Sequence, residues 1–586
     1  MPTYTPTSGL DRRTRYEELR ASLWSERQSG FDAHWRDLAD NFMPRRVRFT
    51  IEDRNKGDRR NQDIIDSTGR FSARTLSSGL HSGLTSPARP WLKLTTPNQE
   101  LAESGPVKAW LHVVTQRMLV LFATTNLYNV LPLVYLDMGI FGTAAMSIVA
   151  DTRDLFRCYS YPIGSYALGQ DHRGMVCTFV REYELTVRQV VESFGVQANG
   201  RDIDWTTISR TVRDLWEKGN YEVAVPVCWM VKPNDLPAPP GAKARAKYLP
   251  FASCHWEYQS NEPLFLRESG FKTNPIMAPR WDITGEDTYG TDCPGMTALG
   301  DTQQLQSMQL EKAKAISKQV DPPVVAPSQI RGMKTSLLAG DITYVDLREG
   351  MQGMRSVYDV NLNLRDLTFD IQQVQYRIQR AFYEDLFLML ARSDEQRGTQ
   401  PPTAREIDER HEEKLLALGP VLERTNDELL DPIVDRVYAM MEAAGLFPPP
   451  PPEIEGVILK PEYISILAQA QKLVGVVGQD RFLQSTAVLA QEFPEVKFKI
   501  DTNRVVNNYA EMLGVDPRIV RSDEAANELQ KASADAAIQQ QQSEQMVNAA
   551  KAAKDASQAP VTGDSVLNRL LTGAQQPGAI TAPPTG

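Results

Sequence analysis

The chain has 586 residues, of which 41% are hydrophobic and 24% are charged. At about 150 residues per domain, this length predicts roughly four domains, and the ordinary composition excludes a wholly disordered, collagen-like or mucin-like chain. With 64 lysines and arginines against 74 aspartates and glutamates, the net charge is −10. A protein that binds nucleic acid over its whole surface would be basic, so this class of protein is excluded. A local contact with DNA is still compatible with the charge.

Cysteine usage and hydropathy indicate folding in a reducing compartment and no membrane segment. The five cysteines are an odd number, stand at least 19 residues apart and form no CxxC pair. The start of the chain, Met1 to Leu10, is polar and predicts no signal peptide. The most apolar stretch, Met118 to Ala150, holds no run of 18 apolar residues because Asn126 and Asp137 interrupt it. It therefore predicts two buried helices of a soluble domain.

The first 220 residues predict helices followed by strands. Apolar residues at positions 31, 35, 38 and 42 have the helical period and predict one helix over 11–43, which ends at Pro44. Further helices are predicted at 66–84, within 105–150, and at 187–194 and 205–218, with strands at 91–94 and within 154–185.

Residues 220–290 differ from their surroundings and predict a small β-rich module between helices. Tyr221 to Val231 is β-branched and aromatic, and further short strands are predicted around 254–258, 264–268 and 274–281. The next segment, Thr297 to Val320, is predicted as a helix that stops at the Asp321-Pro322-Pro323 sequence. It has few large apolar residues, so we expect it either to bridge solvent or to pack laterally against copies of itself.

The second half of the chain predicts more helices and a biased tail. Strand and loop are expected at 324–361 and helices at 362–392, at 403–445 with breaks or kinks at Pro420 and Pro432, and within 461–513. Pro448 to Pro452 is a stiff spacer. From Ser522 onward the chain is rich in Ala, Gln and Ser, which predicts at most a weak helix and then a disordered end.

Motifs for catalysis are missing. The chain has no phosphate-binding GxxxxGK[ST], no GxGxxG after a strand, no HExxH and no GxSxG, and its six histidines are scattered. Cys254 and His255 are unsuited as a nucleophile pair, because neighbours on a strand point to opposite faces. We therefore predict no enzyme, no cofactor and no metal. A carboxylate site assembled from distant residues remains an alternative.

Four segments, in order along the chain, resemble motifs of one family. They are Asp66-Ser67-Thr68 with Ser82 to Trp91, Tyr289-Gly290 with Pro294 to Asp301, Gly419 to Pro432, and Glu462 to Gln471. On these segments the chain is similar to the head-to-tail connector, or portal, proteins of short-tailed bacteriophages over roughly residues 10–515. One departure is Thr291-Asp292, where that family more often has a basic residue.

The resemblance implies an α+β, mainly α-helical portal-type fold with wing, stem, clip and crown, assembled as a ring of about twelve subunits around a central channel. By resemblance, the segments are the N-terminal wing 1–185, the first stem region 186–219, the β-rich clip 220–295, the second stem helix 296–321, the wing and tunnel-loop region 322–400, the helical wing or crown base 401–447, the Pro-rich spacer 448–460, the crown or barrel helices 461–535, and a low-complexity, largely disordered tail 536–586.

The resemblance also suggests residues that face the channel. Residues 347–361 lie where the family has its tunnel loop, with Arg348 and Arg355 for phosphates and Met351 and Met354 for soft contact, although an ordinary surface loop is the alternative. On the second stem helix, Lys314 and Lys318 share a face. They would point toward the channel or a neighbouring subunit, with a solvated outer face as the equal alternative.

The function implied by the resemblance is that of a portal through which double-stranded DNA is packaged and ejected. Expected partners are further copies of the chain, the DNA, the major capsid and scaffold proteins, the terminase and the tail adaptors, with no membrane. The expected location is one capsid vertex of the virion, after assembly in the host cytoplasm. Alternatives are another virion structural, scaffold or adaptor protein and, with less support, a metal-dependent enzyme of DNA processing.

Overall fold

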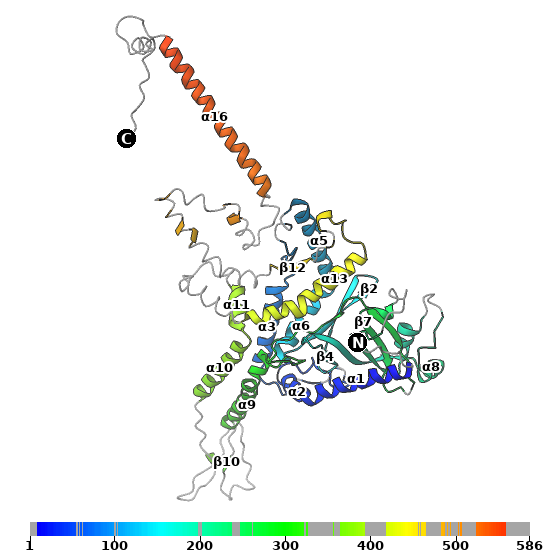
Figure 1. Cartoon of the computed structure of the whole chain (residues 1–586). Helices are drawn as coiled ribbons and strands as arrows, with labels where there is room; N and C mark the ends of the chain where they lie inside the picture. Colours follow the sequence, from blue (N-terminus) through cyan, green and yellow to red (C-terminus); the bar gives the residue numbers. More distant parts are fainter. Residues whose placement is uncertain are drawn as a thin grey trace, which may run out of the picture. The chain divides into compact units, whose positions relative to one another are not determined.

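Figure 1 shows the computed structural model of the chain, which divides into two compact units, Met1–Ser485 and Thr486–Gly586. The structure describes residues 9–53, 57, 59–60, 63–98, 101, 104–196, 202–236, 246–260, 262–320, 324–325, 355–356, 364–392, 418–454, 456, 459–464, single positions between 482 and 506, and 523–557.

The described fold is mixed α+β and mostly helical, which confirms the predicted class. The helices of the first unit include α1 (Gly9–Gly30), α2 (Asp32–Asn41), α3 (Thr68–Leu84), α5 (Gly105–Thr124), α6 (Leu127–Phe141), α7 (Val187–Val190), α8 (Arg210–Glu217), α9 (Pro294–Val320), α10 (Leu364–Ala381), α11 (Glu384–Arg392) and α13 (Asp431–Ala443). The short 3-10 or π-helical turns are η1 (Val191–Gly195), η2 (Ala246–Tyr248), η4 (Asn426–Leu430) and η5 (Pro452–Ile454).

One antiparallel sheet of five strands dominates the β structure. Its order is β4 (Tyr166–Gln170), β5 (Val176–Thr186), β6 (Ala224–Pro233), β7 (Phe251–Glu257) and β8 (Arg267–Phe271). A second sheet has the order β3 (Leu155–Tyr161), β2 (Ala145–Asp151) and β9 (Ile276–Met277), and two further pairs join β1 (Leu92–Thr95) to β12 (Lys460–Tyr463) and β10 (Val324–Val325) to β11 (Arg355–Ser356).

The strands predicted within 220–290 form, but not as a module of their own. β6 pairs with β5 over eight residues, from Phe179↔Val231 to Thr186↔Ala224, so β6, β7 and β8 continue a sheet that begins before residue 185. Pairing with β5 on one side and β7 on the other satisfies the backbone N–H and C=O groups along both edges of β6. A separate module of β6, β7 and β8 would leave one edge of β6 unpaired.

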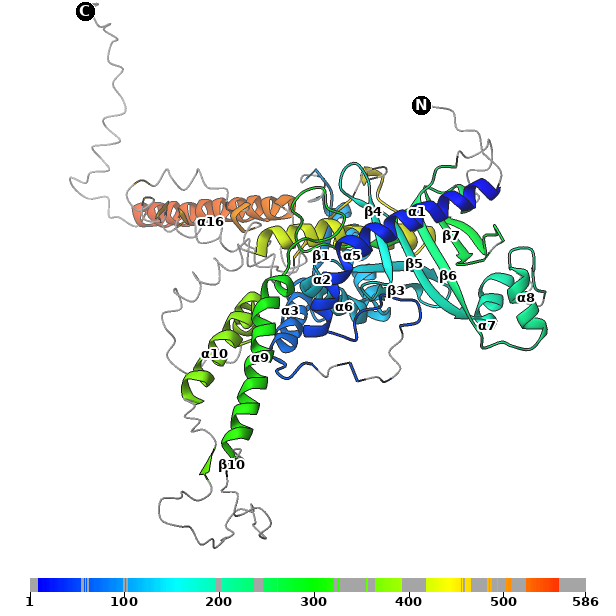
Figure 2. The same ribbon diagram turned by 90° about the horizontal axis from the view of Figure 1, so that it is seen from below.

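The five-stranded sheet is covered on both faces, which explains why β6 is buried along most of its length. Because successive residues of a strand point to opposite faces, Trp229 and Val231 join the main core, whereas Cys228 and Met230 join a separate cluster with residues of α1. Figure 2 shows α1 running along the sheet.

The main core lies around α3 and α6. α6 is buried along most of its length, and α3 packs so closely against it that a Cβ at Gly139 would lie 2.7 Å from a methyl carbon of Leu76. No single described helix is long and apolar enough to cross a bilayer. The bent pair α5 and α6 passes that test only by length and composition, with an angle of 78° between the two helices.

Several predicted elements differ in extent. The helix predicted at 11–43 is two helices, because the chain turns at Phe31, whose ring packs 4.8 Å from the ring of Tyr289. The end of the stretch 105–150 is strand β2, because Gly142 ends α6 in the left-handed conformation with φ +74°. The start of the stretch predicted as helices within 461–513 is strand β12.

The helix around Pro432 continues through a local adjustment instead of breaking. Residues 418–425 are helical, the π-helical turn η4 follows, and α13 begins directly before the proline. A proline lacks the N–H group and crowds the carbonyl four residues earlier, and a wider π turn relieves both problems.

The second unit contains one long described helix, α16 (Asp523–Ser557), of 35 residues. It extends past residue 536, where the low-complexity tail was expected to begin. Its large apolar side chains, such as Leu529, Ile538 and Met546, are exposed within its own unit. Residues 558–586, which include the predicted disordered end, lie outside the described part of the chain.

Candidate functional site: a two-helix hairpin and its anchors

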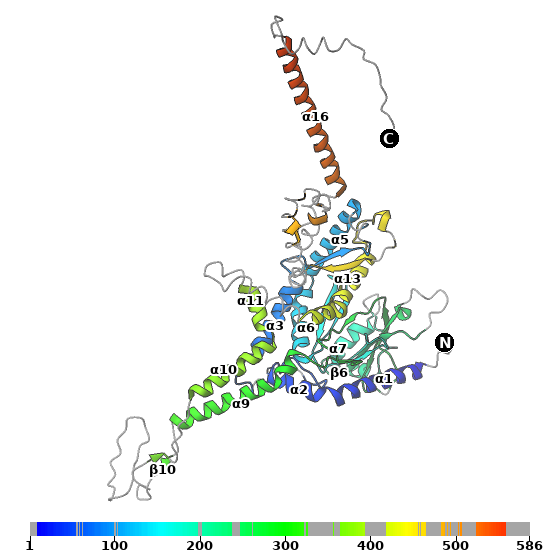
Figure 3. The ribbon, with the colours of Figure 1, turned by 60° about the vertical axis from the view of Figure 1, so that its left-hand side comes forward.

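A hairpin of two long helices is the most distinctive element of the first unit. α9 and α10 lie side by side, and the strand pair β10–β11 connects their outer ends, with Val324 opposite Ser356 and Val325 opposite Arg355 (Figure 3). The predicted polar helix is therefore confirmed at Pro294–Val320, and its partner in space is α10, about 45 residues later.

Only the first half of α9 is buried. Its buried residues end at Leu305, whereas Leu310, Ile316 and Val320 in the outer half are 43%, 41% and 79% exposed. Apolar side chains at these spacings lose free energy by facing water, at roughly 25 cal/mol for each Å² of apolar surface that stays exposed. The exposed apolar side chains in the outer half of α9 therefore indicate that a partner covers this part of the helix.

α10 has the same two-sided character. Ile371, Val374 and Ile378 are buried against the rest of the unit, whereas Phe369 and Tyr376, seven residues apart, are 60% and 52% exposed. An exposed ion pair, with Arg377 Nη2 2.8 Å from Asp301 Oδ1, joins the two helices. Exposed aromatic residues on one stripe of a helix indicate an interaction surface.

Asp66 ties the two helices together near the base of the hairpin. Its Oδ2 accepts hydrogen bonds from Nε2 of Gln309 on α9 and Nε2 of Gln375 on α10, both at 2.9 Å. Its Oδ1 accepts from the backbone N–H and the hydroxyl of Thr68. Burial alone would raise the pKa of Asp66, but these hydrogen bonds outweigh it and lower that pKa.

Gln306 of α9 completes this anchor. Its Oε1 accepts from the backbone N–H groups of Ile65 and Asp66 at 2.7 and 2.8 Å, and its Nε2 donates to the Asp66 carbonyl. The Asp66-Ser67-Thr68 motif therefore serves to fix the spacing and direction of the hairpin. Sequence reasoning noted this motif only as a resemblance and missed the glutamines.

The base of α9 is held by a close backbone approach at the Tyr289-Gly290 motif. The Gly290 N–H donates to Oγ1 of Thr143 at 2.7 Å, and a Cβ at Gly290 would lie 2.1 Å from the Gly142 carbonyl oxygen. The Tyr289 hydroxyl accepts from the N–H of Leu168 at 2.9 Å. A glycine is required at 290 because no side chain fits there.

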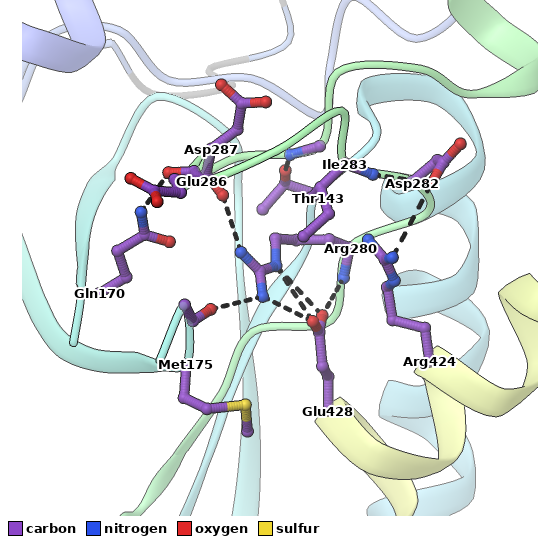
Figure 4. A network of polar contacts seen from close by, with 12 residues as sticks. Thr143, Gln170, Met175, Arg280, Asp282, Ile283, Glu286, Asp287, Arg424 and Glu428 are labelled. Atoms are coloured by element: carbon purple, nitrogen blue, oxygen red, sulfur yellow. Dashed lines mark hydrogen bonds and ion pairs between the residues drawn. The ribbon is translucent and has the colours of Figure 1, made fainter. Parts of the chain in front are cut away.

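A buried ion pair fixes the loop that leads into α9 (Figure 4). Arg280 Nη2 lies 2.6 Å from Glu428 Oε1, and the Arg280 backbone N–H donates to Glu428 Oε2 at 2.8 Å. The remaining guanidinium hydrogens donate to the carbonyls of Asp287 and Gly174. The pair links the segment just before Tyr289-Gly290 to the third resemblance motif, because Glu428 lies within Gly419 to Pro432.

The first and fourth resemblance motifs also meet. Strand β1 follows Trp91 and pairs with β12, and the Trp91 ring stacks on Tyr463 with 6.2 Å between centroids and 3° between planes. The Tyr463 hydroxyl donates to Asp431 at the start of α13. All four motifs thus stabilise the tertiary structure, and two of them anchor α9.

The predicted channel residues can be placed only in part. Lys314 and Lys318 lie one turn apart on the outer half of α9, and both are exposed. Arg355 is in β11, at the tip of the hairpin, and the position of its side chain is not described. Arg348, Met351 and Met354 lie outside the described residues.

Neither a metal cluster nor, at Cys158, Cys254 or Cys293, an activated thiol is found in the described ranges. No group of three or more His, Cys, Asp or Glu side chains there is placed to hold a metal ion. Burial raises the pKa of Cys158 and Cys293 to about 12 and that of Cys254 to about 11, so these thiols are poor nucleophiles.

The described residues define an α+β protein with an exposed, largely polar hairpin of α9 and α10. The chain matches the family described as bacteriophage head to tail connecting protein over residues 13–520, and it belongs to that family. It is 41% identical to the portal protein of Salmonella phage epsilon15 over 557 residues, which cover 95% of this chain and 97% of the relative. It is also 41% identical to the probable portal protein of Bordetella phage BPP-1 over 508 residues, 86% of this chain and 88% of the relative.

Family membership confirms the predicted resemblance and the predicted class, a structural connector and not an enzyme.

Proposed function

We propose that this chain forms a closed ring at one vertex of a phage capsid, as its portal, and that double-stranded DNA passes through the ring during packaging and ejection. The observation that carries this proposal is the hairpin of α9 and α10, whose outer part is polar with exposed apolar side chains on both helices. Copies placed around an axis would cover these side chains and leave the polar faces toward a wet channel.

The hairpin also supports a revised division into segments. The family has two stem helices that flank a small β-rich clip, and α9 and α10 with the β10–β11 pair between them match that description. We assign α9 and α10 to the stem and 321–363 to the clip. The expectation placed the first stem region at 186–219 and the clip at 220–295, but α7 and α8 are short and α7 packs on β5 and β6, so this segment fits the wing.

Under this assignment, the predicted tunnel-loop residues change place. Arg348, Met351, Met354 and Arg355 then belong to the clip segment 321–363. The crown or barrel, expected at 461–535, is extended to residue 557, because α16 continues to Ser557. The subunit number of about twelve rests on the family resemblance alone.

The charge of the chain suits a conduit for DNA. A channel that neutralised many phosphates would hold the strand through counterion release, whereas a ring of subunits with net charge −10 repels it over most of its surface. Lys314 and Lys318 on α9 would supply sparse cationic contacts if they face the channel. Partners would be the capsid and scaffold proteins, the terminase and the tail adaptors, with no cofactor.

Native mass spectrometry of hairpin variants tests the proposal. Ile316→Ser combined with Phe369→Ser removes two apolar side chains that are 41% and 60% exposed, so each subunit should keep its fold. We expect the wild-type chain to give a closed ring of about twelve copies and the variant to give subunits or incomplete rings.

The matched control is Tyr159→Ser on β3, which removes a side chain of similar exposure, 46%, away from the hairpin and should leave the ring intact. A variant that forms rings as well as the wild type would refute the role of the hairpin. Subunits that never form rings but cleave DNA with Mg²⁺ would favour the enzyme alternative.

A further inference from the structure

Helix α1 is attached to the five-stranded sheet by an unusual stripe of residues. The residues of its inner face follow the spacing 3, 4, 3, 4 and are, in order, Arg13, Tyr16, Arg20, Leu23 and Arg27. A helix held by the hydrophobic effect would carry apolar residues at all of these positions. Here arginines occupy three of the five, and Arg13 and Arg27 are only 5% and 0% exposed.

Arginines at both ends and in the middle of α1 form ion pairs or hydrogen bonds with acceptors on the sheet or next to it. Arg20 Nη1 lies 2.5 Å from Glu182 Oε1 on β5, and Arg12 Nη1 lies 2.6 Å from Glu268 Oε1 on β8. At the other end of the helix, Arg27 Nη1 donates to the carbonyl of Tyr166 at 2.7 Å. The attachment is therefore made of polar contacts along the whole helix.

Cation–π contacts and one indole hydrogen bond add to these pairs. The Arg13 guanidinium lies 4.7 Å from the ring centroid of Trp256, and the Arg20 guanidinium lies 4.5 Å from that of Tyr258. The Trp256 indole N–H donates to Glu17 Oε1 at 2.9 Å. Such contacts weaken as ionic strength rises, because salt screens the charges, and the screening is strongest at the partly exposed groups, such as the Arg12–Glu268 pair with side chains 21% and 29% exposed.

What α1 covers is a small apolar cluster that is separate from the main core. On the sheet side this cluster includes Cys228, Met230, Cys254 and Trp256, whereas α1 contributes only Tyr16 and Leu23 as buried apolar residues. The main core lies on the opposite face of the sheet. Loss of α1 would therefore open the small cluster and leave the main core covered.

The connection between α1 and the remaining chain is short and unobstructed. α1 ends at Gly30, α2 begins at Asp32, and nothing lies within 4 Å of the position of a Cβ at Gly30. Since glycine tolerates nearly every backbone conformation, this junction can act as a hinge.

We propose that α1 is a detachable strap: it lifts from the sheet as a unit, while the main core stays folded, and so uncovers the face of β6 and β7 that carries Cys228, Met230, Cys254 and Trp256. The opening requires the loss of ionic and cation–π contacts and of the packing of four α1 side chains, the buried Tyr16 and Leu23 and the partly buried Leu19 and Trp24. This is less than global unfolding requires. Salt favours the open form.

The native cysteines report this opening directly. Cys228 and Cys254 lie in the cluster under α1, whereas Cys158 and Cys293 lie in the main core, and all four are buried. Burial raises the pKa of each of these thiols, so labelling requires an opening event that exposes them.

The experiment is time-resolved labelling of the assembled full-length protein with N-ethylmaleimide, with each cysteine read separately by peptide mass spectrometry. Cys228 and Cys254 should react about ten-fold or more faster than Cys158 and Cys293. Raising sodium chloride from about 0.05 M to about 1 M should speed only the first pair, several-fold. Equal rates for all four cysteines, or no effect of salt on the first pair, would overturn the proposal.

Variants sharpen the result. Arg20→Met removes the pair with Glu182, whose side chain is 6% exposed, and should speed labelling of Cys228 and Cys254 about ten-fold without changing Cys158 or Cys293. If Arg20→Met does not fold, Glu182→Gln tests the same contact. Faster labelling of all four cysteines together would mean that α1 opens only with the whole unit, which contradicts a strap.

The matched control is Arg213→Met, because the Arg213–Glu217 pair is 52% and 58% exposed and joins two residues of α8. It should leave the labelling of all four cysteines unchanged.

Discussion

At the scale of single residues, buried polar groups decide how the protein responds to pH. His255 on β7 is partly buried, with Nδ1 shielded from solvent and the ring stacked on Trp229 at 5.5 Å between centroids and 10° between planes. Burial, with a smaller contribution from the charge of Arg267, lowers the pKa of His255 to about 3. Between about pH 3 and pH 6.5, this imidazole is therefore neutral in the folded protein but protonated in the unfolded chain.

The sign of the pH dependence follows from this difference. Below about pH 6.5, His255 is protonated in the unfolded chain but stays neutral in the folded protein. As the pH falls from there toward 3, the free energy of unfolding therefore decreases by up to about 1.4 kcal/mol for each pH unit. Replacing His255 by Phe, which keeps a planar ring, should remove this loss. Denaturant unfolding at pH 6.5 and at pH 4.5 measures it.

The control for His255 is His172→Gln, because His172 is exposed and should leave the pH dependence unchanged. A His255→Phe protein that loses as much stability between these pH values as the wild type would show that His255 is protonated in the folded state.

At the scale of elements, the sequence predicts what is local and misses what is distant. The helix predicted at Thr297–Val320 is found at Pro294–Val320, because the polar composition and the following prolines are local signals. The pairing of β5 with β6 across 37 intervening residues has no local signal, so the strands of 220–290 were expected to form a separate module. Tertiary packing decides such pairings.

The anchors of the hairpin show the same limit. Asp66 meets Gln309 and Gln375, which are 243 and 309 residues away in the chain, and no spacing rule connects residues so far apart. The four resemblance motifs could be recognised as segments, but their convergence on the base of α9 and on β1–β12 required the structure.

The close contact at Gly290 predicts that adding a single methyl group there strongly destabilises the protein. Gly290→Ala would place a Cβ 2.1 Å from the Gly142 carbonyl oxygen and should destabilise the protein by about 3 kcal/mol or more, with loss of rings. Gly300→Ala on α9 is the control, because nothing lies within 4 Å of that position. It should stabilise the helix by about 1 kcal/mol. Thermal unfolding distinguishes the two, and a tolerated Gly290→Ala would contradict the close approach.

The hydrogen bonds that Asp66 accepts predict that replacing it loosens the hairpin of α9 and α10. Asp66→Asn places a donor where two glutamine amides already donate, so one hydrogen bond or more is lost at a cost of about 2 kcal/mol. We expect faster amide hydrogen exchange in α9 and α10, with α5 unchanged. The same loosening should occur in the wild type at acid pH, since the lowered pKa of Asp66 means that its stabilisation is present above about pH 4 and is lost below it.

The control for Asp66 is Asp63→Asn, a nearby exposed carboxylate, because the carboxylate that accepts from Gln309 and Gln375 is that of Asp66. Equal exchange in the Asp66→Asn and wild-type hairpins would show that the glutamines do not depend on this carboxylate.

At the scale of the whole molecule, membership of the head to tail connecting family implies that this chain is one subunit of an assembly. The single chain exposes Val320 and Phe369 at 79% and 60%, and these side chains are unsuited to permanent contact with water. The motifs for nucleotide hydrolysis are missing from the sequence, so the energy for packaging would come from another protein. Assembly therefore explains both the composition and the structure better than catalysis does.

The central claim is that α9 and α10 line the channel of a ring. Cryo-electron microscopy of the purified protein tests it most directly, because helices are identified individually in such a map. We predict a closed ring in which α9 and α10 of each subunit surround the bore, with the segment between them at one end. A ring whose bore is lined by the segment 186–219, with α9 and α10 away from the axis, would contradict the account.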